Sequence, residues 1–174
     1  MERGVTSRGP TALRMQRRLA QSDAQVRGGH RRLRIGLWSY FLRSDLPTIL
    51  TAPVIYSLAI PFVVLDAWVT LYQAICFRAW GIRPVRRRAY MVIDRHKLAY
   101  LNGIEKAHCL FCSYVNGLIG YVREVAARTE QYWCPIRHAR RVRHAHDHYP
   151  AFADYGDAPA YRRGLAAFRR QLKR

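Results

Sequence analysis

The stretch NGIEKAHCLFCSYVNGLIGYVREVAARTEQYWCPIRH, residues 102–138, decides the fold of this chain. Asn102 and Glu105 have the spacing of a capping box, in which each side chain bonds the backbone N–H of the other residue. We therefore predict a helix that begins at Gly103. It extends to Trp133, because a proline two residues later is typical of the first turn of a new helix.

Cysteines give this helix its main chemical interest. Cys109 and Cys112 form a CxxC pair, the shortest spacing that lets two thiolates share one ion. Cys134 and His138, four residues apart, could add two further ligands for zinc or an iron–sulfur cluster. The alternative is that the CxxC thiols are small core residues, since free cysteine is often buried.

Distance limits this metal site. Along an unbroken helix Cys134 lies about 33 Å from Cys112, at roughly 1.5 Å per residue. The apolar pattern continues through Asn116-Gly117 without a change of phase, which favours an unbroken helix. A site that uses Cys109, Cys112, Cys134 and His138 therefore needs a reversal at Asn116-Gly117 or a second, antiparallel chain.

One arc of the same helix carries small and polar residues together. Small side chains let two helices approach closely, so we predict that this arc contacts a protein partner or a second copy of the chain. The arc consists of Asn116, Gly117, Gly120, Arg123, Ala127 and Glu130.

The run IDRHKLAYLNGIEKAHCLFCSYVNGLIGYVREVAARTEQYWCPIRHARR resembles the core of an uncharacterised family of small bacterial membrane proteins. Its pattern is close to YLN-x-x-EK-x-x-C-x-x-C-x-Y-x-NG followed by RTEQYWCPI-[KR]-H, and the resemblance spans roughly residues 45–158. His108 stands where a polar residue such as Asn is expected, which argues against a site built on that position. The resemblance implies a bacterial inner-membrane location and no particular activity.

Length and charge limit the remaining possibilities. The 174 residues suit one domain with tails. Thirty Lys and Arg against eleven Asp and Glu give a net charge of +19. This charge indicates an anionic binding partner, such as acidic lipid, nucleic acid or an acidic protein. Nucleic acid is disfavoured because the aromatic residues are not interleaved with arginines on a strand platform. Four cysteines without a secretory signal indicate reduced thiols on the cytoplasmic face.

The N-terminal segment, residues 1–44, is a basic tail with ten arginines. We predict that residues 1–30 are disordered, because they show no sustained hydrophobic period. From Leu33 onward, apolar residues and arginines alternate in a way that suits a short helix in the membrane interface. A solvated basic linker is the alternative.

Residues 45–78 form the predicted membrane segment. Leu46 to Phe77 is thirty-two residues without Lys or Arg, longer than the about 20 that one span needs. Both flanks are basic, so the positive-inside rule favours a helical hairpin that turns near Ala59-Ile60-Pro61, with a single tilted span as the alternative. Asp66 is the only acid from Leu46 to Phe77, and it is either functional at membrane depth or neutralised near the turn.

Residues 79–101 follow as a basic connector. Its arginines, together with the last residue of the membrane segment, are the predicted contacts to anionic lipid. These lipid-binding residues are Arg78, Arg83, Arg86, Arg87 and Arg88.

The helical core, residues 102–143, should end in a brief basic helix from Pro135 to Arg143. Residues 144–174 contain a His-rich loop and a last helix from Tyr161 to Leu172. The loop's metal-binding candidates are His144, His146, Asp147 and His148.

The predicted fold is mostly α. It comprises a membrane-embedded hairpin or single span, a long cytoplasmic amphipathic helix and short C-terminal helices. The favoured function is a non-enzymatic, membrane-attached accessory or interaction protein. The alternative is a metal or thiol-redox protein using Cys109, Cys112 and Cys134. A third hypothesis makes Cys134 a nucleophile with a lowered pKa and His138 its base. The sequence has no P-loop, HExxH or GxSxG motif, so it names no reaction.

Overall fold

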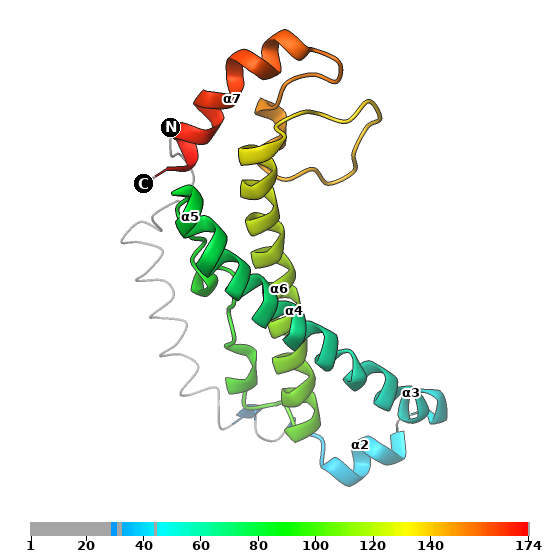
Figure 1. The fold of residues 1–174 in the computed structure, drawn as a ribbon. Helices are drawn as coiled ribbons and strands as arrows, with labels where there is room; N and C mark the ends of the chain where they lie inside the picture. Colours follow the sequence, from blue (N-terminus) through cyan, green and yellow to red (C-terminus); the bar gives the residue numbers. More distant parts are fainter. Residues whose placement is uncertain (1–28, 31–32, 44, 174) are drawn as a thin grey trace. The chain divides into compact units, whose positions relative to one another are not determined.

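The computed structural model describes residues 29–30, 33–43 and 45–173, and these residues are mostly helical (Figure 1). The mostly α fold class is therefore confirmed. The predicted disorder of residues 1–30 lies outside the described residues except at its last two positions. The principal helices are α2 (Leu37–Arg43), α3 (Leu46–Ser57), α4 (Ala59–Tyr72), a π-helix (Gln73–Phe77), α5 (Arg78–Trp80), α6 (Gly103–Trp133) and α7 (Ala158–Leu172).

The chain divides into two compact units. The first contains the described residues up to Ile49 together with Asp94–Leu110, and the second contains Leu50–Ile93 and Phe111–Arg174. In the first unit, the His30 and Tyr100 rings meet edge to face with centroids 5.6 Å apart. This contact joins a residue that precedes the apolar segment to one near the end of the connector.

The predicted bounds of the long helix are confirmed. The Glu105 N–H donates to Asn102 Oδ1 at 2.9 Å, and the Asn102 N–H donates to Glu105 Oε2 at 2.8 Å, which is the predicted capping box. Helix α6 then runs unbroken through Asn116-Gly117 to Trp133. The reversal that would have assembled the four-ligand metal site within one chain does not occur.

The predicted hairpin is wrong. Leu58, between α3 and α4, has helical φ and ψ of −61° and −18°, so the apolar segment continues as one helix from Leu46 to Trp80, 35 residues long. Prolines do not reverse the chain here, because each removes one backbone donor while its fixed φ is already helical. The helix is long and apolar enough to cross a membrane.

The second unit builds its core where the end of this helix, the connector, α6 and α7 meet. Gly81 (φ 69°) ends α5 in the left-handed region and turns the chain back. The Arg83 N–H then donates to the Leu172 carbonyl at 2.9 Å, which ties α7 to the connector. The buried core residues are Phe77, Ile82, Val85, Leu118, Tyr121, Val125 and Leu172.

The C-terminal third departs from the prediction at one element. The basic helix predicted from Pro135 to Arg143 does not form, because this backbone pairs with residue 153 instead: Ala153 N–H donates to the Pro135 carbonyl at 3.0 Å. Helix α7 begins at Ala158, ahead of the predicted Tyr161, because Asp157 caps it by accepting the Ala160 N–H at 2.9 Å.

Candidate functional site

Helix α4 and the π-helix that follows it have one face against α6 and the opposite face exposed. On the covered face, Gln73 Nε2 donates to Tyr121 Oη at 3.1 Å, and the Tyr72 and Thr129 hydroxyls lie 2.9 Å apart. On the other face apolar side chains recur at helical spacing, and we name this set the apolar stripe. Its members are Ile60, Val63, Val64, Trp68, Leu71 and Ile75.

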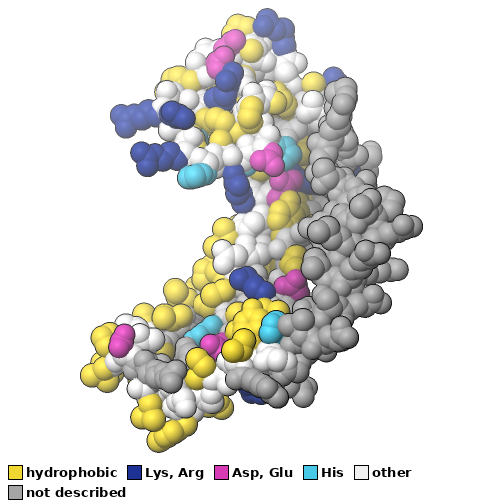
Figure 2. All heavy atoms as spheres, turned by 180° about the vertical axis from the view of Figure 1, so that it is seen from behind, with side chains coloured by type: hydrophobic (Ala, Val, Ile, Leu, Met, Phe, Trp, Pro, Cys, Tyr) yellow, Lys and Arg dark blue, Asp and Glu magenta, His cyan; other side chains and the backbone are white. Residues whose placement is uncertain are grey.

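Helix α3 extends this exposed apolar surface. None of its residues is buried, although most are apolar. Figure 2 shows apolar side chains gathered at the lower left, where α3 lies. Soluble proteins rarely leave a continuous apolar surface of this length open to water, so it is the strongest indication of a binding surface.

Asp66 lies on the covered face of α4, not among the exposed residues. It is 9% exposed, and its Oδ2 accepts hydrogen bonds from Arg87 and from Tyr114 Oη, the latter at 2.9 Å. Burial, and then the bond to Asp66, raise the pKa of Tyr114. The acid therefore holds the connector and α6 against α4, through a hydrogen bond from Tyr114 and an ion pair whose Arg87 side chain is 48% exposed.

The five arginines predicted to bind lipid do not share one environment. Arg87 is committed to Asp66, and Arg83 donates to the Gln171 carbonyl at 3.0 Å. Arg78, Arg86 and Arg88 are exposed, and no acid of the described residues pairs with them. These three are the cations that remain available to an anion.

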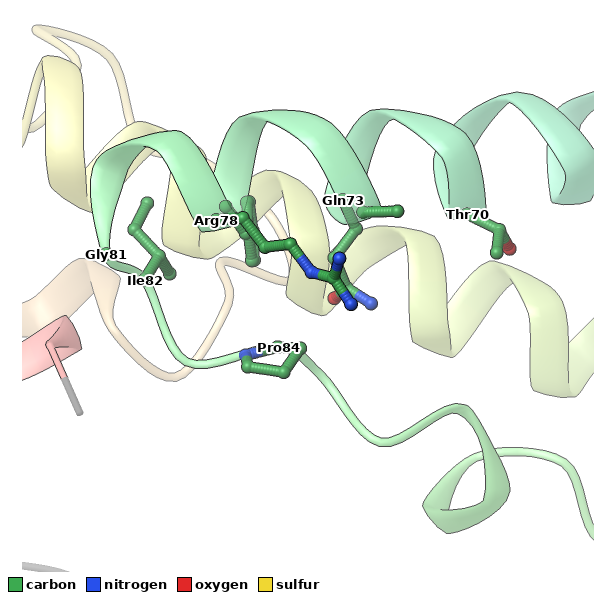
Figure 3. A pocket seen from close by; sticks show the side chains of 8 residues that line it. Thr70, Gln73, Arg78, Gly81, Ile82 and Pro84 are labelled. Carbon is green, nitrogen blue, oxygen red and sulfur yellow. The ribbon is translucent and has the colours of Figure 1, made fainter.

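Arg78 also borders a pocket of about 350 Å³ between α4 and the connector (Figure 3). Its guanidinium extends across the opening toward Gln73. Gln73 is itself engaged, since its Oε1 accepts the Val85 N–H at 2.7 Å. Arg78 is thus the one charged residue that lines this pocket.

The arc of α6 predicted to bind a partner is largely occupied by the chain itself. A Cβ on Gly117 would lie 2.8 Å from the Tyr90 carbonyl oxygen, and one on Gly120 would lie 3.2 Å from the Tyr90 ring. Arg123 donates to the His144 and Ala145 carbonyls. The small residues therefore allow the close approach of the connector, a segment of the same chain.

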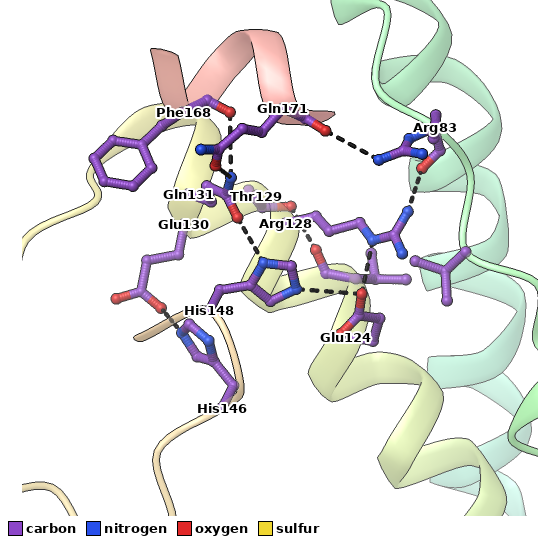
Figure 4. Close-up of polar contacts among 12 residues, drawn as sticks. Arg83, Glu124, Arg128, Thr129, Glu130, Gln131, His146, His148, Phe168 and Gln171 are labelled. Atoms are coloured by element: carbon purple, nitrogen blue, oxygen red, sulfur yellow. Dashed lines mark hydrogen bonds and ion pairs between the residues drawn. The ribbon is translucent and has the colours of Figure 1, made fainter. Parts of the chain in front are cut away.

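A polar network that the sequence did not reveal joins α6 to the His-rich loop (Figure 4). His148 lies 2.6 Å from Gln131 Oε1 through Nδ1 and 3.3 Å from Glu124 Oε1 through Nε2. Arg128 also bonds Glu124, at 2.7 Å, as the i,i+4 spacing indicates. Burial alone would raise the pKa of Glu124, but these bonds outweigh it and lower the pKa.

His146 completes the network from the same loop. Its Nε2 lies 2.8 Å from Glu130 Oε2, while His144, also a predicted ligand, is exposed. The two loop histidines therefore contact carboxylates of α6, which is not the arrangement expected of two ligands of one metal ion. The acids that these histidines contact lie sixteen and twenty-four positions earlier in the chain. No pattern in a single sequence predicts a contact over such a separation.

The thiols are not gathered at a metal centre. Within the described residues, no group of three or more His, Cys, Asp or Glu is placed to hold an ion. Cys134 follows the last residue of α6, and burial, then the neighbouring Glu130, raise its pKa. This contradicts the lowered pKa that the nucleophile hypothesis needs. The His138 N–H binds Tyr149 Oη at 2.7 Å, in a non-helical segment. Metal shared between two chains stays a prediction.

The chain matches no protein-family model, no curated protein and no solved structure. The resemblance to a family of bacterial membrane proteins therefore stays a prediction.

Proposed function

We propose that the chain is a membrane-attached, non-enzymatic accessory protein, in which the helix Leu46–Trp80 lies along the membrane surface with its apolar stripe in the lipid. The observation that carries this proposal is the one-sided exposure of α4: its uncovered face is apolar, and its other face is packed on α6.

Contacts along the helix argue against a simple crossing. The Tyr56 ring meets Phe111, Asp66 bonds Arg87 and Tyr114, and Trp80 stacks on Tyr132. A span through this region would draw Arg87 and the charges of α6 into hydrocarbon, at a cost of about 2.5–3.5 kcal/mol or more for each charge.

The part of the helix that precedes these contacts is too short to span. From Leu46 to Ile55, before the first of these contacts, are ten residues, or about 15 Å at 1.5 Å per residue. The hydrocarbon core is about 30 Å thick. A helix that lies in the interface needs no such length, and the nearby exposed arginines would contact anionic headgroups.

Flotation of the full-length protein with phospholipid vesicles tests this function. We expect wild type to bind phosphatidylglycerol vesicles more tightly than phosphatidylcholine vesicles. Binding to phosphatidylglycerol should weaken as salt is added, because salt screens the attraction between arginines and headgroups. The variant Ile60→Glu/Val64→Glu should lose at least about tenfold in vesicle affinity, because two charges enter the stripe. Deleting the helix is not a fair test, since Phe77 belongs to the core.

Ala107→Glu is the control, since residue 107 is an exposed position on α6 outside the stripe. It should bind vesicles as wild type does. Equal binding by the stripe variant and wild type would overturn the proposal. So would a stripe variant that dissociates a dimer without changing vesicle binding, because the stripe would then be an interface between two copies.

A further inference from the structure

A groove of about 520 Å³ runs between α4 and α6 at the edge of the apolar stripe. Its walls include Val69 and Tyr72 from α4, and Val122, Ala126 and Trp133 from α6. Val69 and Tyr72 are the chain neighbours of the stripe residues Trp68 and Leu71, so the groove is continuous with the surface that we assign to the membrane. Its volume is within the range of about 300–1,000 Å³ that ligand pockets have.

The hydroxyls and the carboxylate that line this groove are bonded inside the protein. Thr129 Oγ1 lies 2.9 Å from Tyr72 Oη and donates to the Val125 carbonyl at 2.9 Å. Glu130 Oε2 is held by His146 Nε2 at 2.8 Å. The groove therefore offers hydrocarbon contact rather than hydrogen bonds, which suits an acyl chain and not a polar ligand.

At one end of the groove an aromatic cluster separates the groove from the guanidinium of Arg169. Trp133 packs edge to face on Trp80 and Tyr132, with centroids 5.2 Å from each. The Arg169 guanidinium lies 4.8 Å from the Tyr132 ring centroid and 5.8 Å from that of Trp133. Tryptophan and tyrosine beside a cation are typical of the headgroup level of a membrane.

Beyond Arg169 lies a basic surface on α7. A depression of about 400 Å³ there is lined by four cations, Arg162, Arg169, Arg170 and Lys173. No acid occurs between Ala158 and Leu172 to neutralise them. Arg169 thus belongs to both features: it contacts a groove wall and lines the basic depression, and its Nε donates to the Tyr132 carbonyl at 3.0 Å.

From this juxtaposition we propose that the second unit binds one anionic phospholipid from the bilayer, with an acyl chain in the α4–α6 groove and its phosphate on Arg169. The proposal rests on the proposed membrane attachment and names the lipid site within it. It places specific lipid recognition on α7 rather than on the connector arginines.

Tryptophan quenching tests this site in the full-length protein, purified in a neutral detergent. In a Trp38→Phe/Trp68→Phe background the remaining tryptophans, Trp80 and Trp133, both belong to the aromatic cluster. Titration with phosphatidylglycerol carrying dibrominated acyl chains should quench them saturably, at one lipid per chain. The same titration with dibrominated phosphatidylcholine should require a higher concentration, because the second lipid carries no net charge.

Two variants locate the lipid. Arg169→Gln should weaken phosphatidylglycerol binding by about tenfold, as loss of a charge-assisted hydrogen bond does. Arg163→Gln, on the same helix but outside the depression, should have no effect. Ala126→Phe should fill the groove and reduce quenching by both lipids, and Ala107→Phe, exposed elsewhere on α6, should not.

Several results would overturn the site. These are equal affinities for the two lipids, equal effects of Arg169→Gln and Arg163→Gln, or unchanged quenching in Ala126→Phe. Ala126 is exposed, so its variant remains informative if Arg169→Gln fails to fold. Vesicle flotation separates this failure from that of the proposed function, because the Arg169 and Ala126 variants should still float through their intact apolar stripe.

Discussion

Glu124 illustrates how single residues of α6 connect distant parts of the second unit. Its carboxylate accepts from Arg128 on its own helix and meets His148 of the loop, while 18% of the side chain remains exposed. Each bond favours the ionised acid, which is why the pKa is lowered in spite of burial. The charge of Glu124 therefore contributes to the stability of the folded state.

This contribution predicts a particular pH dependence. Because the folded pKa is below the ordinary value of 4.5, the unfolded chain binds more protons in acid. The stabilisation is complete above pH 4.5 and is lost as the pH falls through the lowered folded value. Urea unfolding between pH 3 and pH 7 should give a shallower loss of unfolding free energy in Glu124→Gln than in wild type. Parallel curves would show that Glu124 does not titrate differently in the two states.

Asp66 shows why the sequence left two roles open for a single residue. An acid within thirty-two residues otherwise free of charge signals importance without naming a partner. Its partners, Arg87 and Tyr114, are 21 and 48 positions away, and only the tertiary fold brings them to it. The pairing of Arg87 with Asp66 could not be foreseen, because paired and unpaired arginines look identical in sequence.

The helices whose ends are marked by nearby residues were predictable from the sequence. The bounds of α6 follow from a capping box and a proline, both within a few residues of the helix ends. The hairpin was wrong because proline restricts φ without specifying a turn. The absent helix at 135–143 was also unpredictable, since its backbone pairs with residue 153. A segment with a local preference for helix adopts another conformation when a distant segment supplies its backbone hydrogen bonds.

The packing of α6 on the connector provides an element-scale prediction. An alanine methyl at position 117 would meet the backbone of Tyr90 and Met91 at 2.8 and 3.0 Å, and backbone cannot move aside as a flexible side chain can. Gly117→Ala should therefore lower the free energy of unfolding by about 1–3 kcal/mol. Thermal or urea unfolding measures this directly.

Gly103→Ala is the matched control on the same helix. A Cβ there meets nothing within 4 Å, so the substitution should be neutral or stabilising by up to about 1 kcal/mol. Equal effects at the two positions would mean that the connector does not pack closely on Gly117.

For the whole molecule, the first unit limits the topology of the chain. It contains residues on both sides of the apolar segment: the described residues up to Ile49 and Asp94–Leu110. The contact of His30 with Tyr100 joins these two stretches directly. Under the proposed membrane attachment, residues that pack in one compact unit would lie on the same side of the membrane, so the segment between them would begin and end on that side.

Having both ends of the segment on one side is also the topology that the positive-inside rule favours, although the structure that achieves it is not a hairpin. A hairpin would satisfy both basic flanks by crossing part of the bilayer and turning back. A helix that lies along the surface satisfies them without a turn, and it leaves Arg86 and Arg88 near the headgroups. One continuous helix and two basic flanks on one side are therefore compatible.

Reporter fusions test this last step in a bacterial host. A tag at residue 5 and a tag at the C-terminus should report the same compartment, which we expect to be the cytoplasm because free thiols are typical of that compartment. With the four native cysteines replaced by serine, a cysteine introduced at Ile60 should react with a membrane-impermeant maleimide from neither side until detergent is added, as the proposed burial of the stripe in lipid requires. Tags on opposite sides of the membrane would establish a true span. In that case the Arg87–Asp66 pair and the charges of α6 would have to be accommodated within the bilayer.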